Sequence, residues 1–454
     1  MKTWATATVV AVLIGGVYVL SPSTVWFAAA MWVIRRYAVS GLDADDRRWV
    51  TGLLAAAVLL RVAAVAVLFI ATNHDQTPFG IFFGDEAFYV RRAIWLRNVA
   101  LDVPIHTADF IYAFDESGWT GHLYVLAFLQ VLFGVSPYGV HLLSIALYML
   151  GAVVLYRTVR PRFGRAPAIT GLAVLLFLPS LFAWSISALK DPLYFLFTAC
   201  SISWTLAMLR HPRWAVKILA AVGVVALVAV LQTIREQGGV LTGGGIVAGL
   251  LIASVVSRPR ALIALMIALP LVTGAVLSRP QNQLQAYIAI QKAARNHWGH
   301  VETPGITYTL LEPRFYNDSS AISDMQFVDT ARYVVRAFER YVTVPLPWEV
   351  QSRVALLYLP EQIIWYLLVL LLPVGLVFSF QRDPSLAALL FGIAGVTVVV
   401  IAMTSGNVGT LVRHRSLAVP YLLWLSLTGV CELLARARVR GDERAFTKAE
   451  PVWP

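Results

Sequence analysis

Apolar residues recur along this chain in long runs, separated by short segments that are rich in arginine, aspartate and proline. Each run has about 17–22 residues, near the length that crosses a bilayer hydrocarbon core of roughly 30 Å. Backbone groups inside lipid must be hydrogen-bonded within their own segment, so such runs form helices. The pattern predicts membrane spans at residues 50–72, 138–156, 166–184, 192–209, 215–232, 238–256, 261–278, 361–380, 385–403 and 416–435.

The N-terminal region, residues 3–34, adds either one kinked span or a short hairpin broken near Ser21-Pro22. Its first apolar stretch has the length of a signal peptide, but apolar character resumes at residues 25–34, which favours a retained anchor. The composition agrees, with 59% hydrophobic and 13% charged residues, against about 45–50% and 25% in soluble domains. We therefore predict an all-α polytopic membrane protein of about 11–12 transmembrane helices, with interfacial helices in two long external loops.

Positive charge sets the expected orientation, because the cytoplasmic loops of membrane proteins are enriched in lysine and arginine. Basic segments at residues 157–165, 210–217, 257–260 and 436–444 then all lie on the cytoplasmic side. This orientation requires that residues 119–134 lie flat at the membrane interface and do not cross it. The basic loops also account for the net charge of +11, so we expect contacts with membrane lipids and no nucleic-acid partner.

The same topology divides the chain into five parts. They are an N-terminal membrane anchor with a cytoplasmic linker (1–49), a transmembrane core (50–278) with its first external loop (73–137), a second external loop (279–360), C-terminal transmembrane helices (361–435) and a basic cytoplasmic tail (436–454). In the second loop, apolar positions at three- and four-residue steps predict an amphipathic helix over residues 323–342. Ser323 and Gln326 have the spacing of a capping box at its start.

Two adjacent carboxylates, Asp85 and Glu86, stand at the start of the first external loop in the motif GDEAFY. One interpretation is that Asp85 caps an interfacial helix, since acidic residues stabilise helix N-termini. The other is that a carboxylate in a membrane-facing cleft removes the proton of an attacking hydroxyl. Asp191, in the outer segment ALKDPLY, is a second acidic candidate. Alone, it is equally explained as a solvated turn before Pro192, a residue favoured in the first turn of a helix.

Basic residues on the outer side run against the positive-inside pattern and therefore need a reason. Arg413, His414 and Arg415 precede the last predicted span. Clustered guanidinium groups bind phosphate through paired hydrogen bonds, although contacts with lipid headgroups or a structural role explain the cluster equally well. Arg235 either pairs with Glu236 or reaches the same phosphate.

Arg61 lies near the middle of the span 50–72, where an arginine is costly and is expected to face the bundle interior. Four histidines lack the spacing of metal ligands and are expected at the surface: His74, His106, His122 and His297. We predict no histidine metal site. Mg²⁺ or Mn²⁺ at Asp85 and Asp191 stays open, because these cations prefer oxygen ligands.

The order of these features resembles the GT-C membrane glycosyltransferases. A span is followed by GDEAFY, by a long loop that ends in GHLYVLAFLQVLFG, and by ALKDPLYFLF after two further spans. Within that superfamily, residues 50–210 are most similar to the branch of protein O-mannosyltransferases and lipid A aminoarabinose transferases. The resemblance implies that residues 50–278 form a GT-C-like core.

The resemblance also implies an activity. It predicts transfer of a sugar from a polyprenyl-phosphate-linked donor to a glycan, lipid or protein acceptor, at the outer face of a bacterial plasma membrane. Asp85 would then be the catalytic base, Glu86 its neighbour that orients the site, and Asp191 the second acidic site residue. Tyr89, one helical turn from Asp85, would line the same cleft.

Two other functions fit parts of the pattern. A transporter or flippase for lipid-linked saccharides would show repeated halves and charges at the membrane midplane, whereas the distinctive charges here lie in outer loops. A polysaccharide polymerase or ligase would also use external arginines on a lipid pyrophosphate. The early carboxylates favour transfer from a monophosphate carrier.

Overall fold

The computed structural model describes most of the chain, and the statements below concern that part. The described residues are 8, 10–16, 21–73, 85–114, 121–136, 138–256, 267–268, 271, 274–275, 278–346, 348 and 359–448. They form helices joined by short connections, and a single isolated bridge between Thr307 and Asn407 is the β-type pairing found among them. The chain separates into two compact units, Met1–Thr158 with Leu172–Thr242, and Val159–Gly171 with Gly243–Pro454. The five-part division predicted from topology stays a prediction.

Long apolar helices confirm the all-α polytopic membrane architecture. Seven helices in the described part are long and apolar enough to cross a membrane: α3 (Ala44–Ala71), α7 (Gly139–Phe163), α10 (Asp191–Arg210), α11 (Trp214–Ile234), α18 (Leu359–Arg382), α19 (Pro384–Thr404) and α21 (Val419–Lys448). A bent pair, α8 (Arg165–Phe177) and α9 (Pro179–Ile186), makes an eighth span if its two halves cross together. The predicted span 238–256 is a shorter apolar segment, built from a π-helical turn (Val240–Gly244) and α12 (Gly245–Val256). Most of the predicted span 261–278 lies outside the described residues.

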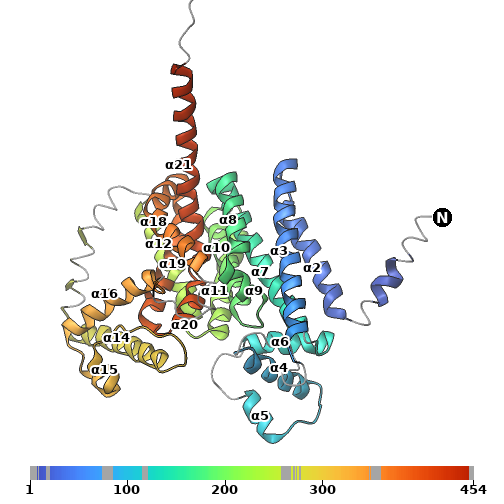
Figure 1. Ribbon diagram of the computed structural model, residues 1–454, viewed down its shortest axis with the longest axis horizontal. Helices are drawn as coiled ribbons and strands as arrows, with labels where there is room; N and C mark the ends of the chain where they lie inside the picture. Colours follow the sequence, from blue (N-terminus) through green and yellow to red (C-terminus); the bar gives the residue numbers. More distant parts are fainter. Residues whose placement is uncertain are drawn as a thin grey trace, which may run out of the picture. The chain divides into compact units, whose positions relative to one another are not determined.

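In the first unit, short helices lie across the direction of the long ones (Figure 1). These are α4 (Glu86–Ala100), α5 (Thr107–Phe114) and α6 (Gly121–Phe133), which share a buried apolar cluster with the start of α7 and with Ala188. Thirteen residues of α6 rise only about 20 Å at 1.5 Å per residue. This length agrees with the prediction that residues 119–134 do not cross the membrane. Helix α2 (Pro22–Val39) begins at Pro22, where the sequence predicts a break.

A buried arginine stabilises the bend between α8 and α9. The two helices meet at 60° because Pro179 has no amide proton to donate and cannot continue α8. The bend leaves carbonyl groups in the last turn of α8 without helical donors. Tyr148 Oη donates to Leu175 O across 2.6 Å, and Arg61 Nη2 donates to Leu176 O across 2.8 Å. Arg61 is fully buried in the first unit, as its position within an apolar span predicts.

The second unit combines long helices with amphipathic ones. It contains α12, α14 (Pro280–Val301), α15 (Pro313–Asn317), a 3₁₀ turn (Ser319–Asp324), α16 (Phe327–Thr343), α18, α19, α20 (Val408–Arg415) and α21. Helix α16 is the predicted amphipathic helix, but its capping box joins Gln326 with Asp329. The predicted box of Ser323 and Gln326 is wrong by three residues, because residues 319–324 form the separate 3₁₀ turn. Helix α14 is not among the helices predicted from the sequence.

His297, on α14, is buried, so its predicted surface position is wrong. Its Nδ1 lies 2.7 Å from Ser405 O and its Nε2 lies 2.7 Å from Tyr316 Oη. Since a carbonyl can only accept, Nδ1 carries the proton, and the tyrosine hydroxyl donates to Nε2. The same hydroxyl accepts from the amides of Leu310 and Leu311. Burial lowers the pKa of His297 to about 4, so the ring is neutral near pH 7.

Candidate active site

Asp85 and Glu86 stand side by side at the start of α4 and have different environments. Asp85 directly precedes the helix, is exposed, and makes no capping hydrogen bond with its side chain. Glu86 is fully buried, and its Oε1 accepts a hydrogen bond of 2.6 Å from the amide of Ala188. The interpretation of Asp85 as a helix cap therefore finds no supporting hydrogen bond in the described part of the chain.

Ala188 is held through both of its backbone polar groups. Its amide donates to Glu86, and its carbonyl oxygen lies 3.1 Å from His122 Nε2. The carbonyl can only accept, so the Nε2 atom of His122 carries the proton in this contact. Two side chains from α4 and α6 thereby fix the segment 187–190, which leads directly into α10. Unpaired buried backbone groups are costly, so each of these contacts stabilises the segment.

His122 is buried, so its predicted surface position is also wrong. Burial lowers the pKa of this histidine to about 4, and the hydrogen bond to the Ala188 carbonyl opposes the shift. Gly121, which precedes His122, allows the start of α6 to lie close to the end of α11. A Cβ atom on Gly121 would lie 2.4 Å from Thr233 Oγ1, so a larger residue there would push the start of α6 away from the end of α11. The described part of the chain places His106 at the surface, as predicted, and His74 lies outside it.

Tyr89 lies between His122 and Lys190. Its ring meets the His122 ring in a T-shaped contact at 5.7 Å, and Lys190 Nζ lies 5.8 Å from its centroid. This geometry is typical of a cation–π contact. The predicted site residues Glu86 and Tyr89 are therefore brought to the segment that precedes Asp191.

Asp191 and Arg235 form a buried ion pair. Asp191 begins α10, Arg235 follows the last residue of α11, and Arg235 Nη2 donates to Asp191 Oδ1 across 2.9 Å. The guanidinium also lies over the ring of Tyr194 at 5.8 Å. The Tyr194 hydroxyl is hydrogen-bonded to Thr242 Oγ1 at 3.0 Å, in a π-helical turn of the kind often found at functional sites. The sequence offered Glu236 as the partner of Arg235, and the structure pairs Arg235 with Asp191.

The basic cluster of the sequence lies in the second unit, at the end of α20. Arg415 is buried, and it donates to Gln362 Oε1 at 3.0 Å and to the carbonyl oxygens of Tyr341 and Val344 at 2.5 and 2.6 Å. These contacts favour the structural role among the alternatives for Arg415. Arg413 and His414 are half-buried.

Glu86 and Asp191 each have one carboxylate oxygen that is engaged by a protein donor. The described residues contain no group of three histidine, cysteine, aspartate or glutamate side chains that could hold a metal ion. Asp191 Oδ1 faces a guanidinium, and Glu86 Oε1 faces an amide donor. A cation at either oxygen would have to displace these donors.

A comparison with protein families identifies a match that includes the segment 187–191 of the candidate site. A family model described as dolichyl-phosphate-mannose-protein mannosyltransferase matches residues 120–278. These residues carry a GT-C family domain. The match includes His122, Asp191 and Arg235, whereas Asp85 and Glu86 precede it. No curated protein and no solved structure matches the chain.

The GT-C match confirms the resemblance seen in the sequence and fits its protein O-mannosyltransferase branch. Together with the apolar helices, the match over residues 120–278 supports a membrane glycosyltransferase of the GT-C type. This family favours an enzyme over the transporter considered from the sequence.

Proposed function

We propose that this GT-C glycosyltransferase transfers a sugar from a polyprenyl-phosphate-linked donor to a hydroxyl-bearing acceptor at the outer face of the membrane, with Asp85 as the general base. The observation that carries the proposal is the linkage through Ala188. Glu86 accepts a hydrogen bond from the Ala188 amide at 2.6 Å. The exposed Asp85 directly precedes Glu86, and Ala188 is followed by Lys190 and Asp191, which supports a site shared by these segments.

The proposed reaction is a displacement at the anomeric carbon. The acceptor oxygen forms a bond to that carbon, the bond from the carbon to the phosphate oxygen breaks, and configuration inverts. Asp85 takes the proton of the acceptor hydroxyl, and polyprenyl phosphate leaves with the bonding electrons. Lys190 supplies a positive charge beside the site, which would stabilise the charge that develops on the leaving phosphate.

Glu86, His122 and Arg235 act as positioning residues in this proposal. They are hydrogen-bonded to Ala188 and to Asp191, and these contacts hold the segment 188–191 in place. Tyr89 lies against Lys190 and would line the sugar-binding side. Arg413 belongs to the second unit, and its contact with the carrier phosphate stays a separate prediction.

The test compares two exposed aspartates at opposite ends of α4. Purified protein in lipid nanodiscs is given polyprenyl-phosphate mannose as the donor probe and a membrane extract as the acceptor source, and released polyprenyl phosphate is measured. Asp85→Asn should lower the rate by about 10²–10⁴-fold, because the amide cannot accept the proton. Asp102→Asn, at an exposed position with a positive φ that asparagine tolerates, should transfer at the wild-type rate. Wild-type transfer by Asp85→Asn would exclude this residue as the base.

A further inference from the structure

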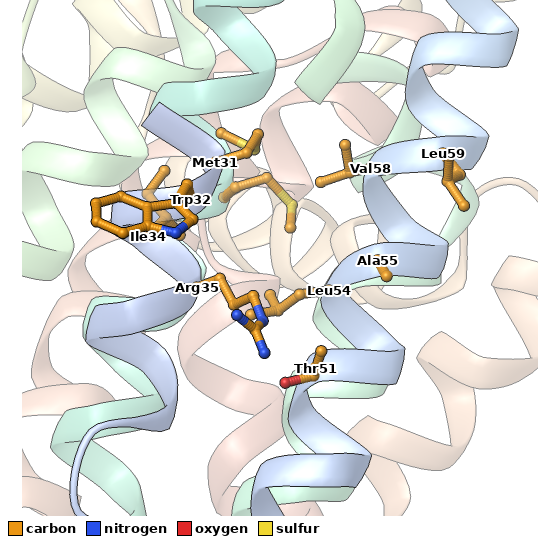
Figure 2. A pocket seen from close by; sticks show the side chains of 10 residues that line it. Met31, Trp32, Ile34, Arg35, Thr51, Leu54, Ala55, Val58 and Leu59 are labelled. Carbon is orange, nitrogen blue, oxygen red and sulfur yellow. The ribbon is translucent and has the colours of Figure 1, made fainter. Parts of the chain in front are cut away.

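Helices α2 and α3 enclose an apolar groove at the end of the first unit that carries the α2–α3 turn. The groove has a volume of about 350 Å³, within the range of roughly 300–1,000 Å³ that is usual for small-ligand sites. Its walls include Met31 and Trp32 from α2, and Ala55, Val58 and Leu59 from α3. Figure 2 shows these two sets of side chains on the facing helices.

The groove is polar at one end only. Arg35 and Thr51 line it, and both lie toward the turn that joins the two helices. Arg35 is exposed and has no hydrogen bond or ion pair within the described part of the chain. The same turn also carries Arg36, Arg47 and Arg48 together with Asp43, Asp45 and Asp46, and none of these six residues lines the groove. An anion at the mouth of the groove would therefore meet the guanidinium of Arg35.

Aromatic residues indicate where this end lies relative to a bilayer. Trp32 is 57% exposed, Trp49 is 63% exposed and Tyr37 is 42% exposed, all near the α2–α3 turn. Tryptophan and tyrosine concentrate at the headgroup level of membranes. Helix α3 is long and apolar enough to cross the bilayer, so the groove runs from the headgroup level toward the hydrocarbon core.

The geometry points to a binding site for one anionic phospholipid, whose acyl chain lies in the groove between α2 and α3 and whose phosphate meets Arg35. The eight-residue step from Thr51 to Leu59 spans about 12 Å of helix, enough to hold the upper part of one acyl chain. The site is separate from the candidate active site, because the groove uses the first half of α3 and Asp85 follows the end of that helix.

Matched variants distinguish this groove from general lipid contact. Ala55 lines the groove, whereas the neighbouring Ala56 is exposed on the same helix and does not. Native mass spectrometry of the full chain, titrated with phosphatidylglycerol and phosphatidylcholine of identical acyl chains, should show one tight site that prefers phosphatidylglycerol. Ala55→Phe should remove this site, and Ala56→Phe should retain it. Arg35→Gln should weaken it about fivefold and abolish the headgroup preference, the effect of one arginine at an anionic surface. Arg36→Gln should keep the preference.

Three results would overturn the proposal. Equal lipid binding by Ala55→Phe and Ala56→Phe would place the lipid outside the groove. Equal affinity of the wild type for both lipids would exclude recognition of an anionic headgroup. Binding of polyprenyl phosphate that is lost in Ala55→Phe, without binding of phosphatidylglycerol, would make the groove a site for the sugar carrier. Arg35 is exposed, so its variant keeps the test decisive even if a phenylalanine at position 55 disturbs α2.

Discussion

Arg235 Nη2 and Asp191 Oδ1 lie 2.9 Å apart, although the two residues are separated by 44 positions in the chain. Both are buried, with exposed fractions of 8% and 5%. The pair ties the end of α11 to the start of α10, immediately after the segment that Glu86 and His122 hold. A buried ion pair of this kind does more to fix geometry than to add net stability.

Breaking the Asp191–Arg235 pair from one side should destabilise the first unit strongly. Arg235→Gln or Asp191→Asn leaves one uncompensated buried charge, which typically costs about 3–5 kcal/mol. The double variant should recover much of that loss, and thermal unfolding of the four proteins gives the coupling energy. Arg314→Gln is the control, since its salt bridge to Asp329 is exposed on the arginine side and should contribute at most about 1 kcal/mol. Additive losses in the double variant would show that the pair is not coupled.

Replacing Glu86 by glutamine should lower stability and activity less than replacing it by alanine. The amide oxygen of Glu86→Gln can still accept from the Ala188 amide, whereas Glu86→Ala leaves that buried donor unpaired at a cost of about 1–3 kcal/mol. We expect Glu86→Ala to lower both the unfolding temperature and the transfer rate, and Glu86→Gln to retain most of each. An equal loss of transfer in both variants, with unchanged stability, would instead give Glu86 a chemical part in the reaction.

Stability should fall as the pH decreases from about 6.5 to about 4. The pKa of His122 is lowered to about 4 in the folded protein, so between these values the unfolded chain binds a proton that the folded chain does not. Above the unfolded value near 6.5 the histidine contributes no pH dependence, and the loss levels off below about 4. A shift of this size corresponds to a loss on the order of 3 kcal/mol.

His297 titrates in the same direction, so one histidine variant should remove only part of the pH dependence. His122→Gln keeps a donor for the Ala188 carbonyl but cannot be protonated. Its unfolding temperature should fall less steeply than that of the wild type between pH 6.5 and 4. An identical slope in the two proteins would mean that His122 is not neutral and buried in the folded state.

Replacing each of the two arginines of α20 by lysine should have different effects on stability and on donor binding. Arg415→Lys keeps the charge but loses the planar fork that reaches Gln362 and the carbonyls of Tyr341 and Val344, so its unfolding temperature should fall. If Arg413 holds the carrier phosphate, Arg413→Lys should weaken binding of polyprenyl phosphate about ten- to a hundredfold and leave unfolding unchanged. Unaltered affinity in Arg413→Lys would remove this residue from the donor site.

Cysteine labelling tests the orientation. In a background of Cys200→Ala and Cys431→Ala, the variants Ser320→Cys and Pro212→Cys introduce thiols at exposed positions. In sealed cells an impermeant maleimide should label position 320, in the predicted second external loop, and not position 212, in a predicted cytoplasmic loop. The reverse pattern would invert the topology and place Asp85 on the cytoplasmic side.

The sequence by itself determined the features that depend on local composition. Apolar length sets the positions of the long helices, and the thirteen-residue α6 agrees with the segment expected to stay out of the bilayer. Pro22 begins a helix where the sequence predicts a break, because proline lacks an amide donor and has a fixed φ. The bend at Pro179 has the same cause, but it lies inside the predicted span 166–184 and was not predicted. The acidic residues Asp85, Glu86 and Asp191 were singled out as candidates from local motifs, and their roles in the site stay predictions.

Only the tertiary structure decided what these residues contact. Asp191 and Arg235 were each recognised in the sequence, but their pairing depends on how α10 meets α11. His122 and His297 were expected at the surface because their neighbours in the chain belong to loops, yet each is buried by segments distant in the sequence. Arg61 donates to Ser185, to Ala57 and to the carbonyl of Leu176, and the last of these is available as an acceptor because α8 bends. Burial and hydrogen-bond partners are properties of helix packing, and a linear pattern of apolar and polar residues does not encode which helices meet.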